Sequence, residues 1–311
     1  MSRIELVRAP NPSPMTLSGT NSYVVDCGGG SALVIDPGPA IERHIEALIA
    51  NAERRGLAIE AIALTHGHPD HAPAAEPLAA RTGAMIYAHP FSEVPGATAF
   101  ELDADLRVGE LRVRVIDAPG HTFEHVALYE PAEGALFTGD VILGEGTVVI
   151  APPGGAMRPY MQTLERFERE FPAARRIYGG HGPIVEDARA KIAEYIAHRK
   201  GREAELVAAL RIGPSTIPQL VVRIYGPAKS PLYPAMARQI LAYLLALAQE
   251  GRVRTRALGR PMTTEETAML NPAWESLVGA EHAPVVEAEL GAMLKLDTLY
   301  EYELTGVTES S

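Results

Sequence analysis

Cysteine is almost absent from this sequence of 311 residues, in which Cys27 is the only one. A single cysteine excludes an internal disulfide bond and any zinc site built from several thiolates. It is typical of a protein from a reducing compartment. With 47% hydrophobic residues the chain can still bury a large core, and its length suits two domains.

Long apolar segments are also missing. The longest apolar run covers residues 240–248 and predicts a core helix, since a membrane-spanning helix needs roughly 20 apolar residues. The first 15 residues have no apolar stretch of the kind that secretory signal peptides carry. We therefore expect a soluble, cytoplasmic protein with no membrane partner.

Basic residues are outnumbered, and the net charge of −11 argues against a protein that binds nucleic acid over its whole surface. The charge is unevenly distributed, however. Residues 206–260 contain eight Lys or Arg and one acidic residue, a net charge of +7, whereas residues 261–311 contain ten acidic residues and one lysine, a net charge of −9. Opposite charges attract, so we predict that the acidic segment folds and packs on the basic one or on a second subunit.

The first two thirds of the chain alternate between strand and helix patterns. We predict hairpins at residues 23–35 and 126–138, helices at 41–55, 74–82 and 160–171, and further strands at 59–64, 85–88, 111–116 and 176–178.

After His181 the pattern changes to helices at 187–210, 215–225 and 231–249, followed by a basic hairpin at 251–258. This order is typical of a winged-helix unit. We therefore predict an α/β domain at residues 1–204, a winged-helix-like domain at 205–260 and a helical acidic extension at 261–311.

Four candidate metal ligands follow the predicted strand at 59–64 within six residues, namely His66, His68, Asp70 and His71. A loop that leaves a strand can turn alternate side chains to opposite sides. His66 and His68 can then hold one metal while Asp70 and His71 hold a neighbouring one. Imidazole and carboxylate ligands without thiolate suit zinc, and also iron or manganese.

Four ligands are too few for two metals, and three further candidates follow other strands. His121, Asp140 and His181 each come directly after a glycine, which allows the backbone to approach a crowded site closely. His89 and His125 are predicted to lie near this site rather than to bind metal.

Together these motifs closely resemble those of the metallo-β-lactamase superfamily. The matching motifs are His66-x-His68-x-Asp70-His71, Gly120-His121-Thr122, Gly139-Asp140 and Gly180-His181-Gly182. The resemblance implies an αββα sandwich of two facing sheets flanked by helices. It also implies that one metal is bound by His66, His68 and His121, that the second is bound by Asp70, His71 and His181, and that Asp140 bridges them. Asn21, Asp36 and Gly38 fall where the family has structural and supporting residues.

The expected cofactor is a pair of divalent ions, with zinc favoured over manganese or iron. Two such ions can share a hydroxide, because metal binding lowers the pKa of water from 15.7 toward about 7. That hydroxide attacks an electrophilic carbonyl or phosphorus atom, so no serine or cysteine nucleophile is needed. Asp70 is also predicted to be catalytic as a proton acceptor.

The ligand set argues against a true β-lactamase, because those enzymes commonly lack the bridging aspartate that Asp140 supplies here. Residues 138–203 most specifically resemble the LACTB-two-like branch of the superfamily, which includes an endoribonuclease specific for single strands and carries a winged-helix domain. The resemblance covers roughly residues 15–258 and has no counterpart that we recognise for residues 259–311. It favours hydrolysis of a phosphodiester in single-stranded RNA or in a nucleotide ester.

Alternatives remain open. Arg252, Arg254 and Arg256 on the predicted hairpin can meet RNA phosphates, or they can pair with the acidic extension or cover a homodimer interface. The negative net charge and the lack of an aromatic stacking surface favour a small-molecule ester or thioester hydrolase of the glyoxalase II kind. A non-catalytic winged-helix binding protein is a third hypothesis, which the complete ligand set disfavours.

Overall fold

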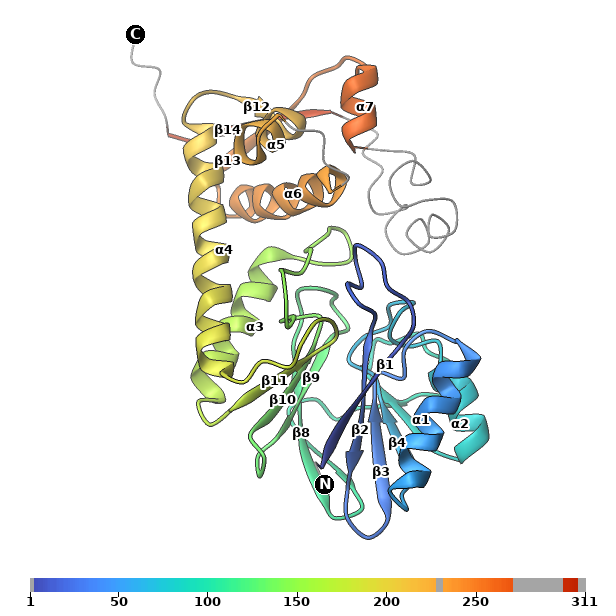
Figure 1. The fold of residues 1–311 in the computed structure, drawn as a ribbon. Coiled ribbons are helices and arrows are strands. Elements are labelled where there is room, and N and C mark those ends of the chain that lie inside the picture. The colour runs from blue at the N-terminus through green and yellow to red at the C-terminus, as the bar shows by residue number, and fades with distance from the viewer. Residues whose placement is uncertain (1–2, 228–231, 271–298, 307–311) are drawn as a thin grey trace. The chain divides into compact units, whose positions relative to one another are not determined.

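The computed structural model describes residues 3–227, 232–270 and 299–306 (Figure 1). The chain divides into two compact units. The first unit comprises Met1–Val148 and Thr163–Ala193, and the second comprises Val149–Gln162 and Glu194–Ser311. We describe each unit by itself.

The first sheet of the first unit has six strands in the order β1-β2-β3-β4-β5-β6. The strands β1, β2 and β3 are antiparallel, and β3 to β6 run parallel to one another. Their bounds are Ile4–Arg8, Asn21–Asp26, Ser31–Ile35, Ala58–Ala63, Met85–Ala88 and Thr98–Ala99. The predicted hairpin of β2 and β3 is confirmed, and β1 was not predicted because it is a short, half-buried edge strand.

The second sheet has five strands in the order β11-β10-β9-β8-β7. Strands β7 to β10 form an antiparallel series, and β11 pairs with β10 in parallel. Their bounds are Asp105–Val108, Leu111–Asp117, Val126–Glu130, Ala135–Gly139 and Arg176–Gly179. The predicted hairpin of β9 and β10 is also confirmed.

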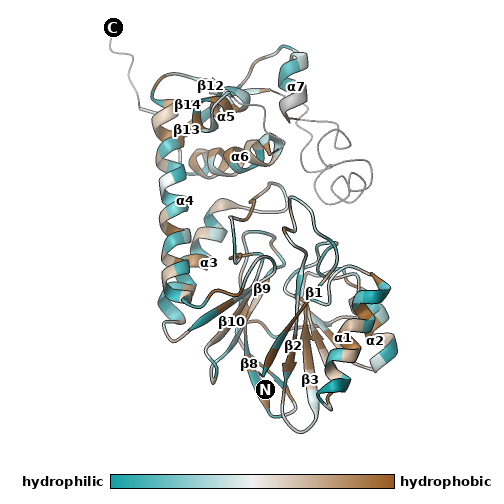
Figure 2. Cartoon of the chain, viewed as in Figure 1, coloured by the Kyte–Doolittle hydropathy of each residue, from teal (hydrophilic) through white to brown (hydrophobic). Residues whose placement is uncertain are grey.

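The core of the first unit lies between the two sheets. Successive side chains of a strand point to opposite faces, so Tyr23 and Val25 of β2 face Val113, Phe137 and other residues of the second sheet. The rings of Tyr23 and Phe137 lie 5.5 Å apart between centroids. Figure 2 shows the apolar character of strands β1 to β3. The expected pair of facing sheets is therefore present.

Two helices cover the outer face of the first sheet, α1 (Glu42–Arg54) and α2 (Ala75–Thr82) (Figure 1). Val24, on the opposite face of β2 from Tyr23, packs in the same apolar cluster as Leu48 of α1 and Leu78 of α2. On the second sheet, Thr163 of α3 (Met157–Glu170) donates a hydrogen bond to the carbonyl of Pro119, just beyond β8. Helices thus lie outside both sheets.

The described residues of the second unit contain the first turns of α3, the C-terminal part of α4 (Ala188–Leu210), the helices α5 to α7 and a small sheet. The helices are α5 (Ile217–Tyr225), α6 (Tyr233–Gln249) and α7 (Thr264–Leu270). The strands are β12 (Ser215–Thr216), β13 (Val253–Ala257) and β14 (Tyr300–Leu304), in the antiparallel order β12-β14-β13. No helix among the described residues is both long and apolar enough to cross a membrane.

Two predictions for the second unit are wrong. Residues 251–258 do not form a hairpin of their own, because β13 is a single strand that pairs with β14. The acidic extension is not wholly helical, because Tyr300–Leu304 form that central strand. The pairing places Arg254 opposite Glu303 and Arg256 opposite Glu301. Opposite charges directly across a strand pair stabilise a sheet, and a local pattern cannot show this partner. The larger part of the extension, residues 271–298, lies outside the described residues.

Candidate metal centre

The seven candidate ligands lie in loops that leave four strands of the two facing sheets. His66, His68, Asp70 and His71 follow β4 of the first sheet. His121 follows β8, Asp140 follows β10 and His181 follows β11 of the second sheet. The structure brings all seven together at one edge of the sandwich.

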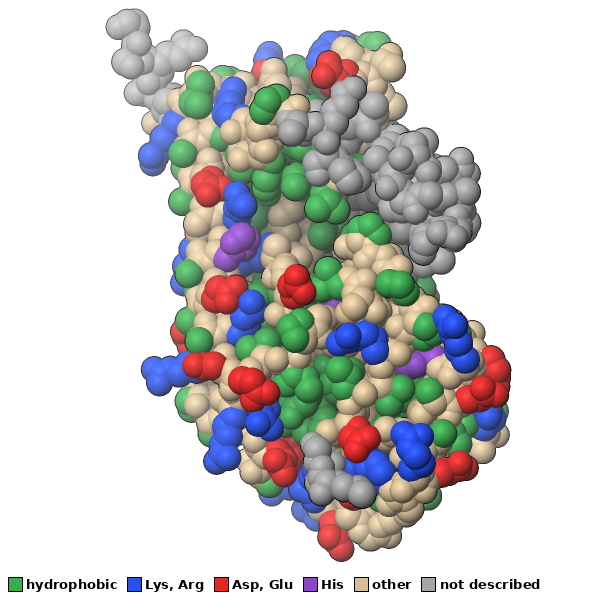
Figure 3. Space-filling view, viewed as in Figure 1, with side chains coloured by type: hydrophobic (Ala, Val, Ile, Leu, Met, Phe, Trp, Pro, Cys, Tyr) green, Lys and Arg blue, Asp and Glu red, His purple; other side chains and the backbone are tan. Residues whose placement is uncertain are grey.

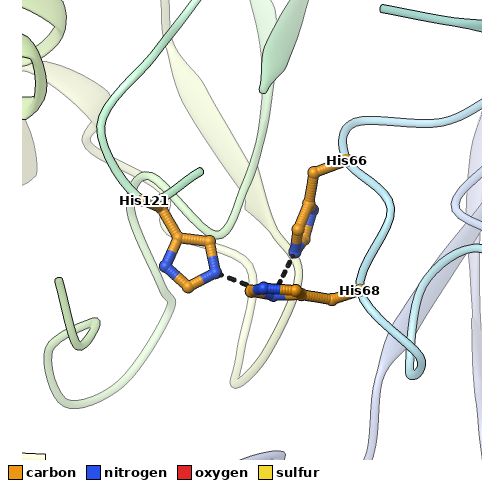
Figure 4. A group of neighbouring side chains, drawn as sticks. All are labelled: His66, His68 and His121. Atoms are coloured by element: carbon orange, nitrogen blue, oxygen red, sulfur yellow. Dashed lines mark hydrogen bonds between the residues drawn. The ribbon is translucent and has the colours of Figure 1, made fainter. Parts of the chain in front are cut away.

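Three histidines form the first group (Figure 4). Nδ1 of His68 lies 3.0 Å from Nε2 of His66 and 3.1 Å from Nε2 of His121. Burial lowers the pKa of His66 well below its usual value and that of His68 to about 3. Neutral imidazoles have the free lone pair that a metal ligand requires, so these three nitrogens suit one cation.

Asp70, His71 and His181 form the second group, and all three side chains are buried. Oδ2 of Asp70 lies 3.1 Å from Nε2 of His181 and 3.4 Å from Nε2 of His71. The group thus offers two imidazole nitrogens and one carboxylate oxygen to a second cation.

Asp140 lies between the two groups. Its Oδ1 is 3.5 Å from Nε2 of His71, and its Oδ2 is 3.4 Å from Nε2 of His181 and 3.8 Å from Nε2 of His121. One carboxylate therefore reaches ligands of both groups, as a group that bridges two metals must.

Electrostatics of the site favour added positive charge. Burial opposes the charged form of His71, but Asp70, Asp140 and Asp36 outweigh it and raise its pKa well above the usual value. Burial also opposes the charged form of His181, but the nearby carboxylates, mainly Asp140, outweigh it and raise the pKa of His181 to about 10. Nε2 of His71 and Oδ1 of Asp140 are buried without a hydrogen-bond partner in the part of the chain that the structure describes. Unsatisfied buried donors and acceptors are costly, and divalent cations would satisfy both atoms.

Asp36 makes hydrogen bonds that position the ligand His71 and the start of the histidine motif. Its carboxylate accepts hydrogen bonds from the backbone N–H and the hydroxyl of Thr65, both at 2.7 Å, and from Nδ1 of His71 at 2.9 Å. Asp36 also lies within reach of His66 and His71 as a possible third group. Because its oxygens already accept these hydrogen bonds, we assign it the supporting position that the sequence predicted.

Two threonines near the ligands were missed by the sequence interpretation. The hydroxyl of Thr20 donates to Oδ2 of Asp70 at 3.1 Å, and the hydroxyl of Thr65 lies 3.0 Å from Nδ1 of His66. Thr65 adjoins the histidine motif and could have been found from that position. Thr20 is 50 positions from Asp70 and has no local signal.

Glycines allow the close approach that was predicted. A Cβ on Gly180 would lie 2.3 Å from Oδ1 of Asp140 and 2.6 Å from Cε1 of His71. A Cβ on Gly139 would lie 2.4 Å from the hydroxyl oxygen of Thr65. All three distances are far below van der Waals contact, so only glycine fits at either position without a shift.

His125 and His89 differ in their distance from the site. The Nε2 atom of His125 accepts a hydrogen bond from the backbone N–H of Asp140 at 3.2 Å, and its ring stacks on that of His66. His125 therefore contacts the site without joining either ligand group. His89 instead lies 3.5 Å from Asp117 and accepts a hydrogen bond from the backbone of Phe91.

Cys27 is buried in the core between the two sheets. Burial raises the pKa of its thiol to about 12. A thiol that stays protonated and away from solvent is not a nucleophile.

Comparisons with relatives and solved structures identify the family of this chain. Residues 15–181 match the family model described as "Metallo-beta-lactamase superfamily". The "Beta-lactamase-like protein 2 homolog" of Caenorhabditis elegans is 34% identical over 208 residues, which cover 65% of this chain and 68% of the relative. The protein of the same name from Drosophila melanogaster is 31% identical over 262 residues, or 78% of this chain and 87% of the relative.

Among solved structures, a metallo-beta-lactamase family protein of Thermus thermophilus has a TM-score of 0.67 at 24% identity, and the match covers 82% of this chain and 96% of that one. This likeness shows a shared fold. The family match covers more than half of the sequence, and the chain therefore belongs to the metallo-beta-lactamase superfamily, whose members are generally metal-dependent hydrolases.

Proposed function

We propose that the chain hydrolyses phosphodiester bonds, in single-stranded RNA or a nucleotide ester, with two divalent metal ions of which zinc is favoured. The observation that carries the dinuclear assignment is the position of Asp140, whose two oxygens lie 3.5 Å from His71 and 3.8 Å from His121. A carboxylate placed between two convergent ligand groups is typical of two-metal hydrolytic sites.

Each group of side chains has a separate task in this proposal. His66, His68 and His121 hold one ion, Asp70, His71 and His181 hold the other, and Asp140 contacts both. When bound, the ions supply a water activated for attack at neutral pH and positive charge that stabilises the transition state.

Asp70 is proposed to accept a proton as well as to bind metal. Thr20 donates to the same oxygen, Oδ2, that faces His181 and His71, which fixes the orientation of the carboxylate. Asp36 accepts the Nδ1 hydrogen of His71 and so directs Nε2 of that ring toward the metal position.

The substrate is proposed from the relatives. Two proteins named "Beta-lactamase-like protein 2 homolog" match this chain, and the match with the Drosophila protein extends over 78% of it. That is longer than the family match of residues 15–181, so the likeness includes part of the second unit. It supports the LACTB-two-like branch and with it a nucleic acid or nucleotide substrate.

The second unit is proposed to be a winged-helix domain. Its order of helix, short strand, two helices and two paired strands supports the assignment, with α4, β12, α5, α6, β13 and β14 in those places. Helix α7 lies between the last two strands in the sequence. Two arginines of β13 are already paired, Arg254 with Glu303 and Arg256 with Glu301. On the face seen in Figure 3, basic and acidic side chains are interspersed. The cytoplasmic location and the homodimer remain predictions.

A panel assay tests the proposal. The purified protein is analysed for metal and then offered bis-p-nitrophenyl phosphate, single-stranded RNA and a thioester. We expect about two ions per chain and turnover of the phosphodiesters that stops with a chelator and returns with zinc or manganese. Turnover of the thioester alone would reject the phosphodiester and support the glyoxalase II type of hydrolase. Activity that survives exhaustive chelation would exclude metal catalysis.

A further inference from the structure

Helix α6 of the second unit carries a buried arginine that has no counterion among the described residues. Arg238 is 4% exposed. Its Nε and Nη2 atoms are buried and have no hydrogen-bond partner in residues 3–227, 232–270 and 299–306. Arg238 also makes no ion pair with the described acidic residues.

Several other arginines of the same unit have interaction partners. Arg252, Arg254, Arg256 and Arg260 are more exposed, and each forms an ion pair with a glutamate. Arg199 is as deeply buried as Arg238, but it donates to Oε1 of Gln239 at 3.0 Å and lies over the ring of Tyr160. Of these buried and exposed arginines, Arg238 alone has neither an ion pair nor a hydrogen bond to these nitrogens among the described residues.

Arg238 does not avoid the cost of a buried charge by losing its proton. Burial lowers the pKa of Arg238 to about 10, which leaves the guanidinium charged at neutral pH. A charge removed from water without a partner is strongly unfavourable. An anion that binds to Arg238 would recover the lost interaction.

The two unpartnered nitrogens also define the shape of that anion. Nε and Nη2 form one edge of the planar guanidinium, and their two N–H groups point in the same direction. This edge matches two oxygens of a carboxylate, sulfate or phosphate in a paired arrangement. We propose that Arg238 is an oxyanion-binding residue that holds a carboxylate or phosphate group through Nε and Nη2.

The next residue provides a second unsatisfied donor. Gln239 is 8% exposed, and its Oε1 accepts hydrogen bonds from the backbone N–H of Ile150 and from Arg199. These contacts identify the oxygen end of the amide, and its Nε2 is left buried without a partner in the described chain. Two adjacent residues of α6 thus have buried donors without acceptors among the described residues. The proposal does not depend on the metal centre or on its substrate.

Thermal unfolding of the metal-loaded protein in different salts tests the site. Sodium sulfate is the tetrahedral probe and sodium acetate the planar one, each titrated against sodium chloride at constant ionic strength. We expect the thermal unfolding midpoint of the wild type to rise with one of the two anions. Arg238→Met should need at least a tenfold higher concentration of that anion for the same rise. Arg238→Lys keeps the charge but loses the paired geometry, so its response should fall between the two.

Arg256→Gln is the matched control, because it removes a positive charge from the same unit at a 75% exposed side chain, and it should respond like the wild type. In chloride alone Arg238→Met should be as stable as the wild type or more stable, since it removes an uncompensated charge. Equal responses of Arg238→Met and the wild type would place all binding at other sites and overturn the proposal, as would no response in either.

Crystallography gives a measurement that does not depend on a variant's folding. Wild-type crystals soaked separately in sulfate and in acetate should show one of these anions within hydrogen-bond distance of both Nε and Nη2 of Arg238. The anion that binds distinguishes a phosphate-like ligand from a carboxylate. An empty guanidinium edge in both soaks would reject the site.

Discussion

Asp36 binds the ring of His71 on the side opposite the other ligands, with 2.9 Å between Oδ2 and Nδ1. This contact leaves Nε2 of His71 directed toward Asp70 and Asp140. We predict that Asp36→Asn lowers metal affinity or activity about 10- to 100-fold, because an amide supports a metal-bound histidine less well. Competition with a chromophoric chelator measures the affinity. Unchanged affinity would show that Asp36 is only structural, and circular dichroism controls for folding.

Asp140→Ala should lose metal and activity together, because its carboxylate lies close to ligands of both groups. Asp36 is also near His66 and His71, but its oxygens already accept hydrogen bonds from Thr65 and His71. Elemental analysis and turnover on a phosphodiester are measured on the same preparation. Cys27→Ala is the control, since its thiol is buried and protonated, and both of its values should stay at the wild-type level. Normal metal content and turnover in Asp140→Ala would contradict the assignment.

Gly180→Ala should displace the metal ligands, because the added Cβ would lie 2.3 Å from Oδ1 of Asp140. We expect at least a tenfold loss of metal affinity in a protein that still folds. Gly201→Ala in α4 is the matched control, since nothing lies within 4 Å of its added Cβ. That variant should be as stable as the wild type or up to about 1 kcal/mol more stable, because alanine favours helix. Equal metal affinities in both variants would refute the close approach.

His44 should make stability depend on pH. It is 1% exposed and its Nε2 lies 2.9 Å from the hydroxyl of Ser22. Burial lowers its pKa to about 4, whereas an unfolded histidine has a pKa of about 6.5. Between these values only the unfolded chain binds the proton, so the free energy of unfolding falls as the pH drops through this window and is fully retained above it.

The full effect is about 3 kcal/mol, from a shift of about 2.5 units at 1.36 kcal/mol each. Urea unfolding of the wild type and of His44→Gln at pH 7.5 and 4.5 measures it, because glutamine does not titrate. Between pH 7.5 and pH 4.5 the wild type should lose more free energy of unfolding than His44→Gln does. A difference that is the same at both pH values would show that His44 does not titrate in this range.

Glu301 and Glu303 neutralise the arginines of β13, so their removal should expose positive charge. Truncation of the extension cannot test this, because β14 is the central strand of its sheet. The double variant Glu301→Gln, Glu303→Gln should bind single-stranded RNA more tightly. Its affinity should also fall more steeply with salt, by the amount expected for up to about two additional phosphate contacts. Glu186→Gln, which frees Arg176 of the first unit, is the control. Binding unchanged from the wild type would mean that this strand does not face RNA.

Much of the fold, and the residues that meet in the candidate metal centre, could be predicted because the signals are local. The spacing of His66, His68, Asp70 and His71 identifies a ligand loop within six residues, and a glycine precedes each of the distant ligands. The hairpins of β2 with β3 and of β9 with β10 have both strands and their turn in one short segment. The sequence indicated that no cysteine nucleophile is needed, and the burial of Cys27 agrees.

Contacts between distant segments were decided only by folding. β13 pairs with β14 across 49 positions, from Arg254 to Glu303, and Thr20 meets Asp70 across 50. The local sequence of these segments does not predict their partners, because strand pairing depends on which surfaces the rest of the chain brings together. Arg238 is a further example. Its place in an apolar helix is visible in the sequence, but its burial without a partner for its charge among the described residues depends on how the helices pack.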